Sequence, residues 1–137
     1  AREVMKYTLL GVIPSISRTK VHSSAGIERI VPKIVGRDLP HFPLGDAYQI
    51  LQANLKFLCS DKPLKSIVVT SAVAKEGKSE VAANLAVAMA EVGRRVLLVD
   101  ADMRQPIQHH IWGLTNAIGL TNVIVDQVAL NSVIQRV

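Results

Sequence analysis

The chain has 137 residues, of which 49% are hydrophobic and 20% are charged, an ordinary composition for one globular domain of this length. No apolar stretch reaches the roughly 20 residues of a membrane-spanning helix, and charged residues together with Pro14 interrupt any signal-peptide core. A single cysteine, Cys59, excludes an internal disulfide, which suits a reducing cytosol.

The formal net charge of +5 is distributed unevenly. Residues 1–65 carry ten Lys or Arg against five Asp or Glu, whereas residues 66–137 carry six of each, so the whole excess precedes residue 66. Such a segment either lies on an anionic surface, as of a membrane or nucleic acid, or is a solvated linker. Because no aromatic residues alternate with the basic ones, no nucleic-acid partner is expected.

The first third of the chain predicts little regular structure. Tyr7 to Ile13 is a short apolar segment that favours an edge strand or an extended arm. Residues 15–43 are rich in Ser, Gly, Pro and basic side chains and indicate a linker, with a brief extended piece around residues 30–35. Its isolated histidines, His22 and His41, are expected to face solvent, since metal sites need clustered ligands.

A helix is predicted over residues 44–60, where apolar residues recur at helical spacing. Residues 66–70 then form a β-branched run typical of a parallel strand covered on both faces, and residues 95–99 repeat that pattern. Between them an amphipathic helix is expected to end at Gly93. Its polar residues Glu80, Asn84 and Glu91 are expected to turn away from the core. Strand, helix and strand make a βαβ unit with a right-handed crossover.

The chemistry is expected where these strands end. The first strand leads into Ala74-Lys75-Glu76-Gly77-Lys78-Ser79, which ends in the Gly-Lys-Ser of a phosphate-binding loop. Gly77 permits close approach of an anion to the free N–H groups of the helix, Lys78 supplies a cation for phosphates, and Ser79 supplies a hydroxyl for magnesium.

After the second strand come Asp100 and Asp102. They are one residue apart, so in an extended segment both carboxylates point the same way, toward the loop. At that place the two carboxylates would serve as hard oxygen ligands for magnesium or as a group that orients water.

The remaining residues predict short helices. Pro106 suits the first turn of a helix through Trp112, whose ring is expected to fill the space between that helix and the sheet. Residues 113–119 are expected to be loop, and residues 120–125 and 128–137 to form one or two short packed helices.

From Gly11 onward the order of these features resembles the bacterial tyrosine kinases (BY-kinases) of capsular and exopolysaccharide biosynthesis, the cytoplasmic P-loop domain of a polysaccharide co-polymerase. The residues that carry the resemblance are Leu10-Gly11-Val12-Ile13-Pro14, the helix from Asp46 to Leu55, Lys75 to Ser79, and Val96 to Arg104 with its Asp-x-Asp-x-Arg motif. Pro106, His109 and Gly119-Leu120 also sit where similar chains have them.

The resemblance implies an α/β fold, a P-loop NTPase-like parallel sheet with flanking helices that here ends before the third nucleotide motif. It implies that residues 1–43 are a basic juxtamembrane-type linker and that residues 44–137 are a partial nucleotide-binding domain. The implied cofactors are ATP and Mg²⁺. The implied partners are ATP or ADP, a membrane-embedded co-polymerase segment or subunit, and further copies of the chain in a possible homo-oligomer. The implied location is the cytoplasmic face of the bacterial inner membrane.

Carried over residue by residue, the resemblance implies catalytic roles for Lys78, Asp100 and Asp102. It places Ser79, Asp100 and Asp102 on the metal, with Asp100 as base or metal support. The nucleotide would contact Ala74, Lys75, Glu76, Gly77, Lys78, Ser79, Glu80 and Arg104.

The sequence departs from the family pattern at several positions. Ala74 and Lys75 stand where the family loop has Pro-Gly, and a residue with a Cβ restricts positive φ there. The alternative interpretation of Lys75 is a second cation for the phosphates. The family's Glu-x-x-Arg-x-x-Arg, used in ring assembly, is Asp46, Gln49 and Gln52 here. Val123-Ile124-Val125-Asp126 follows the second motif too closely to be the third.

Two alternatives therefore remain beside the autokinase. One is a non-catalytic nucleotide-binding or regulatory interaction module of the same fold, favoured by the altered loop and the missing third motif. The other is a P-loop ATPase of the partition or nitrogenase-iron-protein type, which the Val at position 73, in place of that group's signature lysine, disfavours.

Overall fold

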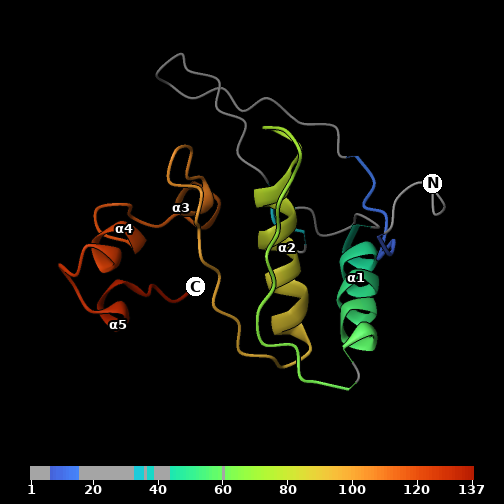
Figure 1. Ribbon diagram of the computed structural model, residues 1–137. Coiled ribbons are helices and arrows are strands. Elements are labelled where there is room, and N and C mark those ends of the chain that lie inside the picture. The colour runs from blue at the N-terminus through green and yellow to red at the C-terminus, as the bar shows by residue number, and fades with distance from the viewer. Residues whose placement is uncertain (1–6, 16–32, 36, 39–43, 60) are drawn as a thin grey trace, which may run out of the picture.

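The structure of this chain is a computed structural model, and it describes residues 7–15, 33–35, 37–38, 44–59 and 61–137. Within these residues the regular structure consists of five helices. They are α1 (Leu44–Leu58), α2 (Lys78–Glu91), α3 (Gln108–Trp112), α4 (Leu120–Ile124) and α5 (Leu130–Val133) (Figure 1). None of the helices in these ranges combines the length and the apolar character required to cross a membrane. The two isolated histidines, His22 and His41, lie outside the described residues.

Helix α1 confirms the helix predicted from residue 44. Its acidic residue in the first turn, Asp46, and its basic residue in the last turn, Lys56, both complement the helix dipole. Tyr48 is buried, with 3% of its surface exposed, where α1 contacts α2. Residues 7–15 lie beside α1 as an irregular arm, and Asn54 Nδ2 donates a hydrogen bond of 2.7 Å to the carbonyl of Leu10 (Figure 1).

Helix α2 begins and ends at glycines in the left-handed region. Gly77 precedes it with φ 86°, and Gly93 follows it with φ 82°. The N–H of Gly93 donates to the carbonyl of Ala90 (2.9 Å) and that of Arg94 to the carbonyl of Met89 (3.2 Å). These two bonds are the paired helix-ending pattern that favours glycine, so the predicted end of this helix is confirmed.

The prediction that Asn84 faces away from the core was wrong. Asn84 is only 2% exposed, because its side chain bonds to a chain segment that the helical pattern of α2 does not reveal. Its Oδ1 accepts from the N–H of Val35 (2.7 Å), and its Nδ2 donates to the carbonyls of Lys33 (3.1 Å) and Glu80 (3.0 Å). A buried amide with these partners is stable, and it ties residues 33–35 to α2.

The sheet predicted from residues 66–70 and 95–99 is not formed within the described ranges, where Val35 alone makes an isolated β-bridge. Figure 1 shows both segments running in the same direction along α2, in the expected order of chain, helix and chain. Their expected burial on both faces was wrong: Val68 is 87% exposed, Leu97 56% and Val99 52%. A strand-like sequence pairs only where a neighbouring strand takes its hydrogen bonds, and these segments have none in the described structure.

The core lies between α2, α3 and the short segment at Ile34. Ile34, Ala83 and Ile111 form its buried centre, with Val87, Leu98, Ile107 and Trp112 packed against it. Arg37 reinforces this contact, since its Nη2 donates to the carbonyl of Ile111 (2.9 Å) and its guanidinium lies 6.0 Å from the Trp112 ring centre. Residues 33–38 were predicted as part of a linker, but Ile34 belongs to the core.

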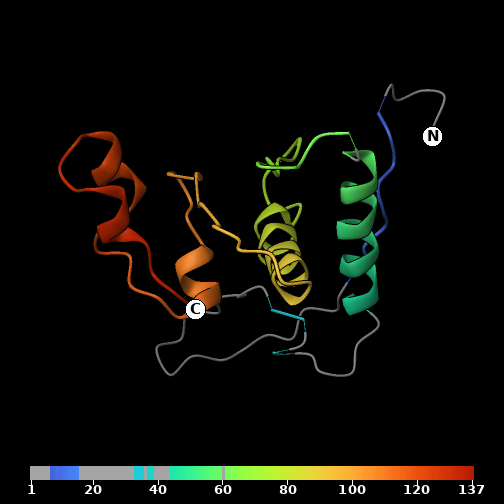
Figure 2. The ribbon, with the colours of Figure 1, turned by 90° about the horizontal axis from the view of Figure 1, so that it is seen from below.

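The three short helices after residue 104 confirm the predicted helical character of this part of the chain. Helix α3 ends at Gly113, which has φ 67°. Helix α4 lies within the predicted range, and α5 occupies only four residues of its predicted range, with Ile134 already extended. Figure 2 shows α4 and α5 together, on the far side of α3 from α1 and α2.

Candidate nucleotide site

The loop before α2 is held by bonds of its own residues. Ser71 Oγ donates to the carbonyl of Val73 (2.9 Å), and the N–H of Val73 donates to Glu76 Oε2 (3.2 Å). Lys75 has φ 67°, a left-handed conformation at the position where the sequence replaces a glycine. A residue with a Cβ thus adopts a positive φ at the position where the family loop has glycine.

Gly77 brings the loop into the first turn of α2 and offers no side chain that could cap it. The first N–H groups of a helix have no partner within the helix, and they carry partial positive charge. The loop and the first turn of α2 are therefore a suitable place for phosphates.

The structure brings the two predicted motifs together through Lys78 and Asp102. The ammonium of Lys78 lies 3.1 Å from Asp102 Oδ2, and both side chains are about one-third exposed or less, at 32% and 27%. The N–H of Gln105 and then the Lys78 ammonium hold the pKa of Asp102 below its usual range. Asp102 is therefore ionised at neutral pH, and Lys78 has a counter-ion that a phosphate would replace.

Asp100 is engaged differently from Asp102. Its Oδ1 accepts from the N–H of Asp102 (3.1 Å), and its Oδ2 accepts from the N–H groups of Ile107 and Gln108 (both 3.0 Å). Oδ1 thus holds the backbone of the second motif at Asp102, and Oδ2 holds the backbone at the start of α3. The arrangement makes Asp100 the residue that shapes the second motif and leaves Asp102 as the carboxylate nearest Lys78.

Gln108 was not predicted and joins the two motifs. It is only 9% exposed; its Nε2 donates to the carbonyl of Ser79 (2.9 Å), and its Oε1 accepts from Trp112 Nε1 (3.1 Å). No motif marks this residue; the signal available in the sequence was a polar residue placed between the apolar Ile107 and Ile111 on a short helix. The partners of such a residue depend on distant chain and cannot be read from local spacing.

The other predicted nucleotide contacts lie around this centre. Ser79 and Glu80 are in the first turn of α2, where the Ser79 carbonyl accepts from Gln108 and the Glu80 carbonyl from Asn84. Ala74 and Arg104 are exposed, one in the loop and one just after Asp102. The nucleotide and metal roles of all these residues stay predictions.

A magnesium ion fits the donor set near Lys78. In the part of the chain that the structure describes, no three His, Cys, Asp or Glu side chains gather closely enough to hold a metal ion by themselves. Magnesium does not require such a cluster, because it keeps several waters and takes one or two carboxylates together with phosphate oxygens. Ser79 and Asp102 are hard oxygen donors of the kind it prefers.

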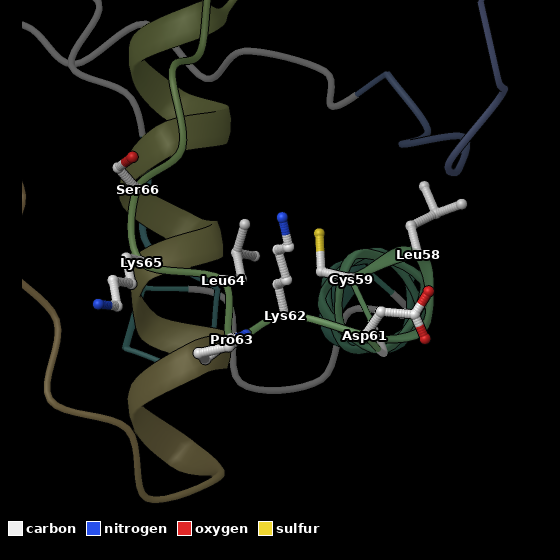
Figure 3. A pocket seen from close by; sticks show the side chains of 8 residues that line it. All are labelled: Leu58, Cys59, Asp61, Lys62, Pro63, Leu64, Lys65 and Ser66. Atoms are coloured by element: carbon white, nitrogen blue, oxygen red, sulfur yellow. The ribbon is translucent and has the colours of Figure 1, made fainter.

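A cavity of about 480 Å³ lies elsewhere, where α1 leads into the extended segment. Figure 3 shows its lining side chains, which are Leu58, Cys59, Asp61, Lys62, Pro63, Leu64, Lys65 and Ser66. None of them is a predicted site residue. The candidate site is therefore an exposed phosphate-type loop rather than this cavity.

Comparison with known proteins identifies the region that carries the two motifs. Residues 67–126 match the CobQ/CobB/MinD/ParA nucleotide binding domain. The match covers the loop, α2 and the second motif, so the P-loop character predicted from the sequence is confirmed.

The relatives of this chain include bacterial tyrosine kinases, which confirms the resemblance seen in the sequence. The chain is 36% identical over 107 residues to the tyrosine-protein kinase YwqD of Bacillus subtilis (strain 168). The aligned residues make up 78% of this chain and 45% of YwqD. It is 30% identical over 91 residues to the tyrosine-protein kinase etk of Escherichia coli (strain K12), or 66% of this chain and 12% of etk.

A solved structure, that of the chimerical protein CapA2B2, matches with a TM-score of 0.76 and 30% identity. The match covers 96% of this chain and 51% of CapA2B2. The chain thus shares the P-loop fold of these proteins while spanning about half their length or less, so their activities come to it only as proposals.

Proposed function

We propose that this chain binds ATP as the nucleotide-binding part of a tyrosine autokinase that regulates exopolysaccharide or capsule polymerisation and export. The observation that carries the proposal is the Lys78–Asp102 pair, 3.1 Å apart, at the start of a helix preceded by a phosphate-type loop. Relatives named tyrosine-protein kinases favour this function over that of a partition-type ATPase.

In this proposal the γ-phosphate and β-phosphate of ATP replace Asp102 as the counter-ion of Lys78. Phosphoryl transfer depends mainly on positioning and on stabilising charge, and an ammonium at the phosphates supplies both. Ser79 and Asp102 would hold the magnesium ion, which neutralises phosphate charge when bound. Asp100 supports the second motif through the hydrogen bonds that its carboxylate accepts from three backbone N–H groups.

We further propose the setting that accompanies this function in the related kinases. The chain acts at the cytoplasmic face of the bacterial inner membrane, beside a membrane-embedded co-polymerase segment or subunit, and it associates with copies of itself. The basic excess in residues 1–65 supports attraction to an anionic membrane surface.

The decisive experiment is calorimetric titration of the chain with ATP and Mg²⁺, beside Lys78→Ala. Because Lys78 is the cation expected on the phosphates, Lys78→Ala should lower ATP affinity by about 10- to 150-fold, the range for removing a hydrogen bond to a charged group. Lys65→Ala removes an exposed lysine outside the site and should bind as the wild-type chain does. Equal affinity of Lys78→Ala and Lys65→Ala for ATP would refute the P-loop proposal.

A second candidate is a non-catalytic nucleotide-binding module of the same fold. The strained conformation of Lys75, φ 67° where the family loop has glycine, favours it because a side chain there limits close approach to phosphate. Incubation of the chain with radiolabelled ATP and analysis for phosphotyrosine separates the two functions. Labelled tyrosine that disappears in Lys78→Ala supports the kinase, and ATP binding without label supports the module.

A further inference from the structure

The two motifs are joined by a closed ring of contacts. Lys78 pairs with Asp102, whose N–H donates to Asp100; Asp100 accepts from the N–H of Gln108, and the Gln108 side chain donates to the carbonyl of Ser79, the covalent neighbour of Lys78. Every link except the two that Gln108 makes joins residues that the motifs predict. Gln108 closes the ring.

Gln108 has the properties of a rigid link rather than of a surface contact. It is 9% exposed, and both polar atoms of its side chain are engaged, Nε2 by the Ser79 carbonyl and Oε1 by Trp112 Nε1. Its own N–H is fixed by Asp100. A buried amide held at three points keeps one rotamer, because leaving any partner unsatisfied costs free energy.

The ring contains one contact that nucleotide binding must break. When phosphates take the ammonium of Lys78, the Lys78–Asp102 pair opens, and the only remaining non-covalent link between the first turn of α2 and the second motif within the ring is Gln108. Asp102 itself stays fixed by the N–H of Gln105 (3.0 Å). The position of Ser79 relative to Asp102 is then set by the bond from Gln108 together with the packing of α2 against α3.

We propose that Gln108 is a positioning residue for magnesium, holding the first turn of α2 at Ser79 in register with Asp102 while Lys78 binds phosphate. This inference rests on the proposed function. A group that orients a metal ligand from behind typically contributes about 10-fold or more to metal affinity. Gln108 should therefore affect magnesium-dependent nucleotide binding and leave the grip of Lys78 on phosphate unchanged.

The test is calorimetric titration of the chain with ATP, once with Mg²⁺ and once with EDTA, in wild type and Gln108→Leu. In wild type the ratio of the two affinities measures the contribution of magnesium. Gln108→Leu should reduce that ratio about 10-fold, with the affinity in EDTA unchanged. Trp112→Phe is the matched control, because it removes the indole N–H from Gln108 Oε1 but leaves the bond to Ser79; its ratio should equal that of wild type.

Gln108→Glu is a second variant in case Gln108→Leu fails to fold, since it keeps the size of the side chain and the acceptor for Trp112. It replaces the donor to Ser79 with a carboxylate oxygen and adds a negative charge. It should show the same reduced ratio, and far-ultraviolet circular dichroism confirms that each variant is folded. A wild-type ratio in folded Gln108→Leu and Gln108→Glu would overturn the inference, as would equal losses with Mg²⁺ and with EDTA. If the wild-type chain binds ATP equally well with and without magnesium, the inference is overturned but the proposed function is not. If the wild-type chain does not bind ATP, both the inference and the proposed function are overturned.

Discussion

Lys75 is the residue where sequence and backbone conformation disagree most directly. Its φ of 67° is in the left-handed region, which an L-residue with a long side chain adopts at a cost of about 1–2 kcal/mol. The bond from the N–H of Val73 to Glu76 Oε2 (3.2 Å) spans this position. Strain of this kind persists where surrounding contacts hold it, and it gathers at functional loops.

We therefore expect Lys75→Gly to leave the free energy of unfolding unchanged or to raise it by up to about 1 kcal/mol, because glycine relieves the strain but gains entropy in the unfolded chain. The matched variant is Lys65→Gly. Lys65 is exposed and has no positive φ, so its replacement should destabilise the chain by about 0.5–1 kcal/mol. Urea denaturation of both variants measures the difference, and equal destabilisation would show that Lys75 is unstrained in solution.

The sequence predicted the centre of the candidate site and missed its support. Lys78 and Asp102 follow strand-like segments at positions where the motifs require them, so their proximity could be expected. The division of roles between Asp100 and Asp102 could not, because it depends on which backbone N–H groups reach each carboxylate. Gln108 was missed for the same reason: its partner Ser79 is 29 residues away.

At the scale of elements, local pattern predicted the helices and failed on the sheet. Helical spacing, Gly77, Gly93 and Pro106 are signals that lie within the element they define, and α1, α2 and α3 begin or end close to them. A strand is defined by its neighbour, so the β-branched run at residues 66–70 indicates only that the chain is extended. The predicted orientation of Asn84 was wrong for a similar reason, because its hydrogen-bond partners at residues 33 and 35 lie outside its helix.

The contact between α1 and α2 predicts a response to alkaline pH. Burial, aided by the charge of Glu80, raises the pKa of the Tyr48 phenol to about 12, against a hydrogen bond with Asn84 that lowers it. A raised pKa in the folded state means that the contribution of Tyr48 to stability is complete below about pH 10 and is lost as pH rises toward 12. Two pKa units correspond to at most about 3 kcal/mol.

Tyr48→Phe should therefore flatten the fall of stability between pH 10 and pH 12, which urea denaturation at a series of pH values measures. Tyr7→Phe is the control, because the Tyr7 ring is 82% exposed and its change should leave the slope as in wild type. An identical slope in Tyr48→Phe and Tyr7→Phe would mean that the α1–α2 contact does not bury this phenol.

The described part of the chain exposes much of what its sequence would bury. Among the described residues, twenty large apolar side chains are exposed, whereas six apolar residues are buried. Among the exposed apolar side chains are those of the two extended segments on either side of α2. The buried centre is correspondingly small, and α2 supplies half of its apolar residues, namely Ala83, Leu85 and Ala88.

This distribution predicts that two similar substitutions will have very different effects. Leu85 is 5% exposed, so Leu85→Ala should destabilise the chain by about 2–5 kcal/mol through lost burial and a cavity. Val68 is 87% exposed although it lies in the most strand-like segment, so Val68→Ala should change the free energy of unfolding by less than about 0.5 kcal/mol. Urea denaturation at several protein concentrations measures both. If Val68→Ala costs as much as Leu85→Ala, the segment at residues 66–70 is covered in solution, and a cost that grows with protein concentration would show that another copy of the chain covers it.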